Sequence, residues 1–221
     1  MKKPEKNSKW DFDKWAKRYD KTIKRGYQAN DWMYKNYEEV LNQVVAFTQD
    51  ILKKPKITMV DIGVGTGNLA QKFVGKVEHL IGIDSSVEML KISKEKLPTI
   101  EARKGDFLEL PVADNSVNLI VSAYAFHHLT EEEKMKALEE MHRILKKQGK
   151  IIIADLMFAN QKAEKGIKSK LIAENKGEIV TEIEEEHYGY MNTLTQKVIG
   201  LGFSVQQKQM TDFVWVICGK R

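Results

Sequence analysis

A short apolar run followed by closely spaced glycines is the strongest chemical signal in this chain. Residues 57–62 are mostly apolar, and Asp61 is followed by Gly63, Gly65 and Gly67. Glycine tolerates positive φ and lets the backbone approach a ligand closely, while a helix behind the turn offers unpaired N–H groups. The order of strand, glycine turn and helix therefore predicts a site for a ligand that carries a carboxylate or a phosphate.

The spacing of these glycines argues against a dinucleotide ligand. The dinucleotide fingerprint needs glycine at the first, third and sixth positions of the loop. Here the fifth position is Gly67 and the sixth is Asn68. NAD is therefore not the expected ligand.

Acidic residues also follow the next two predicted strands. Asp84 comes directly after the run at residues 80–83, and Asp106 follows a weaker run at residues 99–103. A carboxylate has two acceptor oxygens and so suits the two hydroxyls of a ribose. Taken alone, an aspartate at a strand end is usually a turn former. The position of Asp84 after the glycine loop favours the binding role.

His127 and His128 are the strongest candidates for acid–base chemistry. They lie just beyond a predicted strand at residues 117–122, at the edge of an open α/β sheet where ligands bind. Either imidazole can accept a proton from a second substrate or orient that substrate. The alternative is that one of them only hydrogen-bonds the backbone of its turn.

Other residues offer weaker chemistry. Tyr19, Tyr124 and His187 are lesser candidates for the same role. Two adjacent histidines lack the i, i+4 spacing that places two imidazoles on one helix face, and Cys218 is the single cysteine. The sequence therefore predicts no metal site.

The elements that would position these residues alternate between strands and helices. Apolar runs separated by helical patterns predict a mostly parallel sheet with helices on both faces. The clearest strands are at residues 57–62, 80–83, 117–122 and 151–154, with a weaker one at 99–103. Residues 203–210 and 213–218 predict an antiparallel hairpin at the C-terminal end.

One helix has clear end signals. Thr130 and Glu133 form a capping-box pattern before an amphipathic stretch. Lys146 and Lys147 suit its last turn, and Gly149 would stop it. The capping pattern predicts the start of the helix, and the two lysines with the glycine predict its end.

The segments on either side of the central pattern are also predicted to be helical. Residues 10–52 contain three of the four tryptophans, beginning with Trp10. These aromatic residues either pack the helices onto the sheet edge or form a lid over a ligand, and both roles remain open. Residues 158–190 are polar and predict a solvated connecting helix.

Length and composition indicate one domain over residues 1–221. We expect a helical cap at about 1–52 and a sheet domain at about 53–221. The chain is 42% hydrophobic and 30% charged, within the globular range. It contains no apolar run of 18 residues and no apolar segment behind the N-terminal lysines. Together with the lone cysteine, this predicts a cytoplasmic protein without membrane spans.

The charge balance is mildly basic. Lysine and arginine total 36 against 31 acidic residues, giving a net charge of +5. Nucleic-acid binding needs several phosphate contacts on one face. The basic N-terminal stretch is interrupted by Asp11, Asp13 and Asp20. A nucleic-acid substrate is therefore the less favoured reading.

The glycine segment resembles the first motif of class I methyltransferases that use S-adenosylmethionine (AdoMet), in which an acidic residue precedes G-x-G-x-G. The segment at residues 110–119 resembles the L-P-F-x-D-x-S-F-D stretch of methyltransferases related to quinone biosynthesis, with Asn118 and Val117 as departures. The resemblance implies that Asp84 binds the ribose, that Asp106 accepts from the adenine amino group beside Phe107, and that Tyr19 closes over the cofactor. The implied AdoMet-binding residues are Tyr19, Asp61, Gly63, Gly65, Gly67, Asp84, Ser85, Asp106, Phe107 and Ala123.

A closer resemblance covers nearly the whole chain. Residues 15–20, 122–133 and 208–215 are similar to the YrrT-type methyltransferases of Gram-positive bacteria. This implies a Rossmann-like α/β fold, with a seven-stranded mostly parallel sheet, an antiparallel C-terminal hairpin, helices on both faces and an N-terminal helical lid. It also implies a cytoplasmic enzyme tied to AdoMet turnover and sulfur amino-acid metabolism, without a settled acceptor.

The expected activity is metal-free transfer of a methyl group to a small-molecule acceptor, with S-adenosylhomocysteine as product. The sulfonium methyl is already activated, so alignment can supply much of the catalysis, roughly 7–11 kcal/mol for well-oriented reactions. His127 or His128 would take the acceptor proton. A monomer or homodimer is expected. The alternatives are an RNA methyltransferase and a non-catalytic AdoMet-binding protein.

Overall fold

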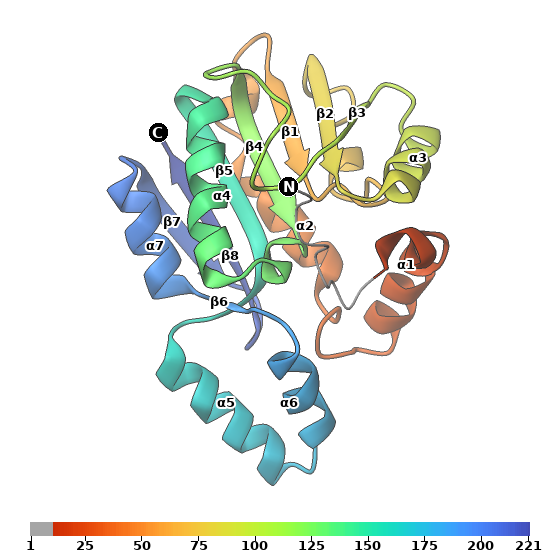
Figure 1. Ribbon diagram of the computed structural model, residues 1–221, viewed down its shortest axis with the longest axis vertical. Coiled ribbons are helices and arrows are strands. Elements are labelled where there is room, and N and C mark those ends of the chain that lie inside the picture. Colours follow the sequence, from red (N-terminus) through yellow and green to blue (C-terminus); the bar gives the residue numbers. More distant parts are fainter. Residues whose placement is uncertain (1–10) are drawn as a thin grey trace, which may run out of the picture.

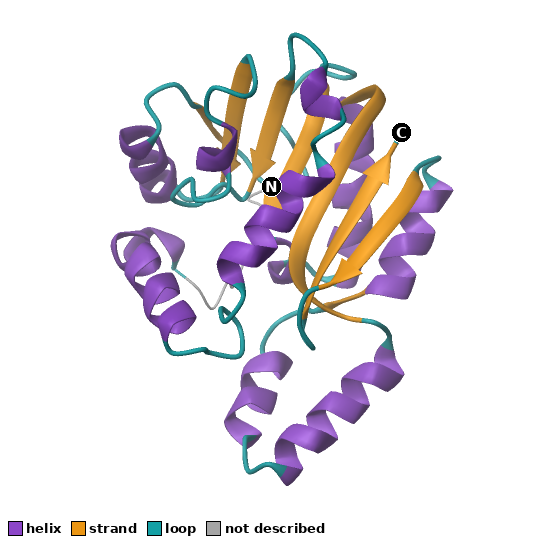
Figure 2. Cartoon of the chain, turned by 180° about the vertical axis from the view of Figure 1, so that it is seen from behind, coloured by secondary structure: helices purple, strands orange, loops and turns teal. Residues whose placement is uncertain are grey.

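A mixed β-sheet with helices on both faces forms the body of the protein in a computed structural model that describes residues 11–221 (Figure 1 and Figure 2). The strand order is β3-β2-β1-β4-β5-β8-β7, and a short strand, β6, pairs with β5. The strands are β1 (Thr58–Ile62), β2 (His79–Asp84), β3 (Glu101–Lys104), β4 (Val117–Ala123), β5 (Leu145–Phe158), β6 (Gly189–Tyr190), β7 (Ser204–Gln209) and β8 (Val214–Lys220).

The pairing directions confirm the predicted Rossmann-like sheet. Strands β1 to β5 run parallel to one another, whereas β8 is antiparallel to both β5 and β7. The C-terminal hairpin therefore lies at one edge of the sheet, as predicted. The two-residue β6 is one strand more than the seven predicted, and it pairs parallel to the end of β5.

The α-helices within the described residues are α1 (Phe12–Gln28), α2 (Tyr37–Phe47), α3 (Val87–Lys96), α4 (Glu131–Ile144), α5 (Gln161–Ala173), α6 (Gly177–Glu184) and α7 (Met191–Gly200). Short 3₁₀ turns occur at η1 (Ile51–Lys53), η2 (Ala70–Phe73) and η3 (Phe126–His128). The N-terminal helices are confirmed from Phe12 onward, whereas Trp10 lies outside the described residues. No helix in residues 11–221 is long and apolar enough to cross a membrane.

Alternate residues of each central strand pack into two hydrophobic layers, one on each face of the sheet. Met59 and Leu119 pack with residues of α2 on one face, whereas Val60 and Ile120 pack with residues of α4 and α7 on the other. Successive side chains of a strand point to opposite faces, so both layers need apolar residues. This explains why the sequences of β1 and β4 are almost continuously apolar. The same packing holds in place the carboxyl ends of the strands, where the candidate site residues lie.

The predicted helix directly after the glycine loop is wrong. The loop is followed by the four-residue 3₁₀ turn η2, and β2 begins at His79. Gly75 adopts φ +74° between them, which turns the chain back early. The segment between Gly67 and His79 contains only this 3₁₀ turn as helical structure. No α-helix N-terminus is therefore available at this loop to hold a carboxylate or phosphate.

The predicted end of the capped helix is also wrong. The capping box of Thr130 and Glu133 is confirmed, but α4 ends at Ile144. Lys146, Lys147 and Gly149 lie in β5 instead. Leu145 takes an extended conformation and begins β5, so the helix ends before the lysines.

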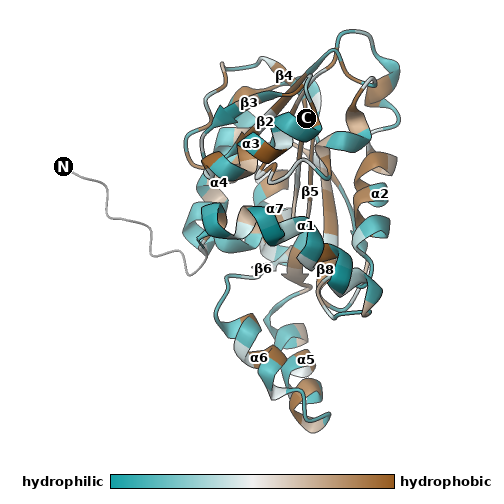
Figure 3. Ribbon diagram, turned by 90° about the vertical axis from the view of Figure 1, so that its right-hand side faces the viewer, coloured by the Kyte–Doolittle hydropathy of each residue, from teal (hydrophilic) through white to brown (hydrophobic). Residues whose placement is uncertain are grey.

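Residues 158–190 form two helices where one was predicted. Helices α5 and α6 extend away from the sheet as a pair (Figure 1 and Figure 3). Each buries a single side chain, Leu171 in α5 and Ile183 in α6. The pair is largely solvated, as predicted, but the segment that follows α6 returns the chain to the carboxyl ends of the strands.

Candidate active site

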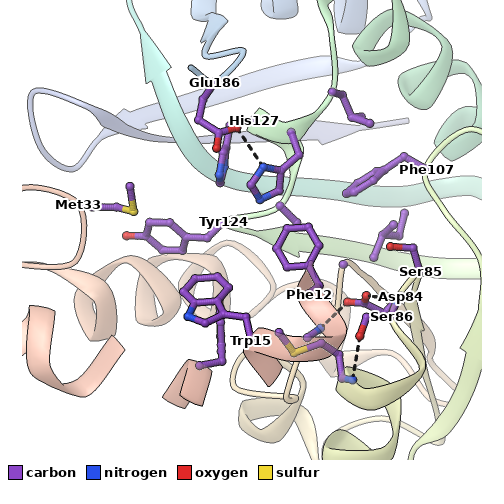
Figure 4. Close-up of a pocket in the computed structure, with 18 of the residues that line it drawn as sticks. Phe12, Trp15, Met33, Asp84, Ser85, Ser86, Phe107, Tyr124, His127 and Glu186 are labelled. Carbon is purple, nitrogen blue, oxygen red and sulfur yellow. Dashed lines mark hydrogen bonds and ion pairs between the residues drawn. The ribbon is translucent and has the colours of Figure 1, made fainter. Parts of the chain in front are cut away.

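A cavity of about 790 Å³ opens where the parallel strands end. Figure 4 shows Asp84, Ser85 and Ser86 on one side, Tyr124, His127 and Glu186 on the other, and Phe12 between the two groups. Cavities that bind small molecules commonly span roughly 300–1,000 Å³. The cavity is therefore large enough for a small-molecule site. Its two sides carry different functional groups.

The glycine loop forms the floor at one end of this cavity. Gly63 and Gly65 line it, with φ of +70° and +52°. A Cβ on Gly63 would lie 2.4 Å from the Cβ of Ala125, so only glycine fits there without a shift. A Cβ on Gly65 would meet no atom within 4 Å. Gly65 thus presents bare backbone to open space, as required where a ligand approaches the chain closely.

Asp84 stands beside this loop at the end of β2. Its Oδ2 accepts from the backbone N–H of Gly65 at 2.8 Å, and its Oδ1 accepts from that of Ser86 at 2.9 Å. Burial raises the pKa of the Asp84 carboxyl, against the lowering effect of these N–H groups. Each oxygen keeps a lone pair for a further donor. The carboxylate is therefore held in place and can still accept two ligand hydroxyls.

Nine of the twelve sequence-predicted site residues line the cavity. They are Tyr19, Gly63, Gly65, Asp84, Ser85, Asp106, Phe107, His127 and His128. Asp106 also accepts from the backbone N–H of Leu108 at 2.8 Å, which holds its carboxylate at the end of β3.

Three predicted cofactor residues lie outside the lining. Asp61 is 1% exposed within β1, and its Oδ2 has no hydrogen-bond partner among the described residues. Burial, followed by the charge of Asp84, raises the pKa of the Asp61 carboxyl well above its usual value. A Cβ on Gly67 would meet Leu97 at 2.9 Å, so this glycine packs against the segment that follows α3. Ala123 ends β4, and the next residues form the wall instead.

Helix α1 covers the cavity and also packs onto the body of the protein. Phe12, Trp15 and Tyr19 line the cavity, whereas Ala16 and Ile23 are buried. The rings of Trp15 and Tyr19 meet edge to face at 4.9 Å. Since every fourth residue of a helix lies on one face, a single helix can do both. The aromatic residues of α1 therefore line the cavity, and their role as a lid over a ligand stays a prediction.

Two aspartates connect α1 to the rest of the protein by hydrogen bonds. Asp13 accepts from the hydroxyl of Ser86 at 2.6 Å at the start of α3. Asp20 accepts from the hydroxyl of Thr66 at 2.6 Å and pairs with Lys96 at 2.8 Å. Because Thr66 belongs to the glycine loop, Asp20 ties the covering helix directly to that loop.

Replacing Asp20 with alanine is expected to loosen α1. The change removes the Thr66 hydrogen bond and the half-exposed ion pair with Lys96, so we expect AdoMet binding to weaken roughly fivefold, ~1 kcal/mol. Hydrogen–deuterium exchange of residues 12–28 should become faster. Lys17→Ala, an exposed change on the same helix, is the control. Unchanged exchange in Asp20→Ala would show that Asp20 does not hold the lid.

The turn that carries the two histidines is built around Asp155. This residue is 1% exposed in β5, and its Oδ2 accepts from the backbone N–H groups of Ala125, Phe126 and His127. Its Oδ1 pairs with Nδ1 of His127 at 2.6 Å. Burial opposes ionisation, but the charge of His127 and its hydrogen bond lower the pKa of Asp155. Asp155 thus fixes the backbone of η3 and the ring of His127 together.

His128 is the more accessible of the two histidines. Its side chain is 27% exposed against 7% for His127, and its Nδ1 lies 3.1 Å from Oε2 of Glu186. Burial, followed by the charge of His127, lowers the pKa of His128 against the opposing effect of Glu186. A neutral imidazole with Nδ1–H donated to Glu186 has Nε2 free to accept a proton.

His127, His128 and Glu186 also form a donor cluster. One donor atom from each lies within 4.8 Å of the others, close enough to be considered for a metal ion. The sequence reasoning rested on the adjacency of the histidines and did not foresee this grouping. Glu186 stands 58 residues beyond His128 and comes close only through the return of the chain after α6.

The charge of the cavity wall is opposite to that of the whole chain. Among residues 11–221, the lining contains eight acidic residues and neither lysine nor arginine, although the chain carries +5. The acidic residues are Asp11, Asp13, Asp31, Asp84, Asp106, Glu182, Glu185 and Glu186. Such a wall favours ligands of net positive charge over anions.

Several site residues had no clear signal in the sequence. Asp155 lies in an apolar strand, and an isolated buried aspartate there was the one available hint. Glu186 and Tyr188 belong to a segment that reads as a solvated connection. Phe12 and Trp15 fall within the aromatic N-terminal stretch, whose position over the cavity depends on the tertiary contacts of α1.

A glycine loop after β1, a carboxylate at the end of β2 and a cavity across the strand ends are the arrangement that open α/β sheets use to bind nucleosides, and it fits a class I methyltransferase. Residues 59–149 match the family model described as a methyltransferase domain. A protein named as an uncharacterized methyltransferase from Alkaliphilus oremlandii is 37% identical over 210 residues, which cover 95% of each chain. A protein named as uncharacterized methyltransferase YrrT from Halobacillus halophilus is 31% identical, again over 95% of each chain. The chain therefore belongs to the YrrT-type methyltransferases.

Solved structures with low sequence identity share the fold. A SAM-dependent methyltransferase from Thermotoga maritima superposes with a TM-score of 0.63 at 20% identity, covering 95% of this chain and 99% of that one. A second, from Mesorhizobium loti, gives a TM-score of 0.59 at 16% identity, covering 79% and 98%. These similarities confirm the fold and carry no information on the acceptor.

Proposed function

We propose that the protein transfers the methyl group of AdoMet to a small-molecule acceptor and releases S-adenosylhomocysteine. The observation that carries this proposal is one continuous cavity that joins the glycine loop and Asp84 to the histidine turn. The open backbone at Gly65 and the fixed carboxylate of Asp84 fit a nucleoside with free ribose hydroxyls. Bound there, AdoMet would supply a methyl group already activated on sulfur.

The residues divide into two groups with separate tasks. Asp84 and the glycine loop would hold the nucleoside, with Asp106 and Phe107 at the adenine. Helix α1 would cover both substrates and exclude water, which strengthens the electrostatic interactions inside the cavity. His128 would accept the acceptor's proton through Nε2, while Glu186 orients its ring. Asp155 and His127 would position the turn that carries His128.

Two alternatives are less well supported. An RNA methyltransferase needs positive charge near its site, whereas the cavity lining described above is acidic. A non-catalytic AdoMet-binding protein needs no proton acceptor, whereas His128 contacts Glu186, lines the cavity and has a pKa that burial lowers. Both observations favour an enzyme that acts on a small molecule.

Turnover is tested by measuring release of S-adenosylhomocysteine from AdoMet with panels of small amines, thiols, alcohols and acids. The proposal expects at least one acceptor to be methylated, with a methylated product identified by mass spectrometry. Methylation of RNA in a salt-sensitive manner, with no small acceptor used, would instead support the nucleic-acid alternative.

A further inference from the structure

The end of the cavity away from the glycine loop has an anionic anchor. Glu186 is 14% exposed at its side chain, and its carboxylate lies beside His128. Asp31, Glu182 and Glu185 also line the cavity. Partly buried carboxylates interact more strongly with a cation than carboxylates in water do, because the effective dielectric is lower. This end is therefore suited to a ligand with positive charge.

Aromatic residues line the same cavity. Trp15, Trp32, Tyr34, Tyr124 and Tyr188 all line the cavity. The face of an aromatic ring attracts a cation, and the attraction is largest where water is excluded. Aromatic faces and carboxylates both attract an organic ammonium group. Together they bind it in preference to a neutral or an anionic group.

Two tyrosine hydroxyl groups in this wall have no hydrogen-bond partner among the described residues. They belong to Tyr124 and Tyr188, which are 8% and 7% exposed. Burial raises the pKa of both phenols, which keeps them protonated. Tyr124 also adopts φ +53°, a strained conformation for a non-glycine residue, where it leaves β4 for the cavity. Both hydroxyl oxygens are closed to solvent, so a ligand in the cavity would meet other parts of these two side chains.

We propose that the methyl acceptor is a small amine that enters as an ammonium ion between Glu186 and the aromatic wall. This inference rests on the proposed function and specifies its substrate class. Phosphates and carboxylic acids are disfavoured because the described cavity wall offers them no lysine or arginine. A neutral alcohol or thiol would fit the aromatic wall but would gain no charge–charge attraction from the carboxylates.

The chemistry balances with the residues present. The bound ammonium gives one proton to Nε2 of His128, which exposes the lone pair of the nitrogen. That nitrogen then forms a bond to the methyl carbon as the carbon–sulfur bond breaks, and the electron pair of that bond stays on sulfur. The products are an N-methylammonium ion and S-adenosylhomocysteine. His128 returns its proton to solvent when the cavity opens.

Binding selectivity tests the proposal without knowledge of the natural acceptor. Protein loaded with S-adenosylhomocysteine is titrated by calorimetry with benzylamine, benzyl alcohol and phenylacetate, which share a ring and differ in the charge of the head group. We expect benzylamine to bind at least tenfold more tightly than the other two. Equal or tighter binding of the alcohol or the acid overturns the proposal, and so does failure of all three to bind.

A pair of variants tests whether Glu186 causes the preference for benzylamine. Glu186→Gln should weaken benzylamine binding about tenfold, because it removes the charge that meets the ammonium. Glu184→Gln makes the same charge change on an exposed residue of α6 outside the lining and should leave binding unaltered. Equal losses of affinity in both variants would show that the net charge of the protein causes the effect, and this would overturn the role of Glu186. Failure of S-adenosylhomocysteine itself to bind would instead reject the proposed function.

Discussion

Asp84→Ala is expected to weaken AdoMet binding by about a hundredfold or more. The change removes two hydrogen bonds that we assign to the ribose hydroxyls, and a hydrogen bond to a charged group contributes roughly 1.5–3 kcal/mol. Two such bonds give about 3 kcal/mol or more, which corresponds to at least two orders of magnitude in Kd. Calorimetric titration with AdoMet measures the loss directly.

His128→Ala is the matched comparison for that experiment. It lies on the acceptor side of the cavity, so its AdoMet affinity should stay close to that of the unmodified protein. Asp84 also accepts from Gly65 and Ser86, so the melting temperature of each free variant must be measured to separate lost ligand contacts from a loosened loop. Similar losses of affinity in both variants would contradict the division of the cavity into a cofactor side and an acceptor side.

His128→Ala should lower kcat by a factor of about 10² or more, since a positioned general base contributes roughly 10²–10⁴. In the unmodified enzyme, the base works only as the neutral imidazole. The pKa of His128 is lowered by burial, so the neutral form predominates at neutral pH and is lost as the pH falls through that lowered pKa, below 6.5. We therefore expect kcat to be sustained at neutral pH and to fall in acid.

The acidic decline of kcat should be absent from the residual activity of His128→Ala, measured with an acceptor that supports turnover. His128→Gln keeps a polar group of similar reach and tests whether positioning alone suffices. Unchanged kcat in His128→Ala would remove it from the chemistry. Loss of activity on treatment with a chelator, and its recovery on addition of Zn²⁺, would assign the donor cluster of His127, His128 and Glu186 to a metal ion instead.

The sheet was predictable because its strands carry local signals. Apolar runs identified β1, β2 and β4, and the C-terminal hairpin was visible from two β-rich segments. The helix after the glycine loop was predicted wrongly, because a family-like glycine pattern says nothing of how soon the chain turns back at Gly75. The end of α4 was predicted wrongly because Lys146 and Lys147 suit a helix terminus as well as the exposed start of β5.

The two sides of the candidate site differ in how far the sequence predicts them. Asp84, Asp106 and the glycine loop follow strands in a fixed order, so their convergence could be inferred from the topology. Glu186 and Asp155 meet the histidines through contacts between distant segments, which no local pattern encodes. The residues of the acceptor side could therefore be identified only from the folded structure.

Calorimetric titration of the purified protein with AdoMet, S-adenosylhomocysteine and NAD tests the central claim most directly, because it needs no knowledge of the acceptor. We predict binding of both sulfur nucleosides in the micromolar range and no binding of NAD. Binding of NAD in place of AdoMet, or failure of both sulfur nucleosides to bind, would contradict the assignment of the glycine loop and Asp84 to AdoMet.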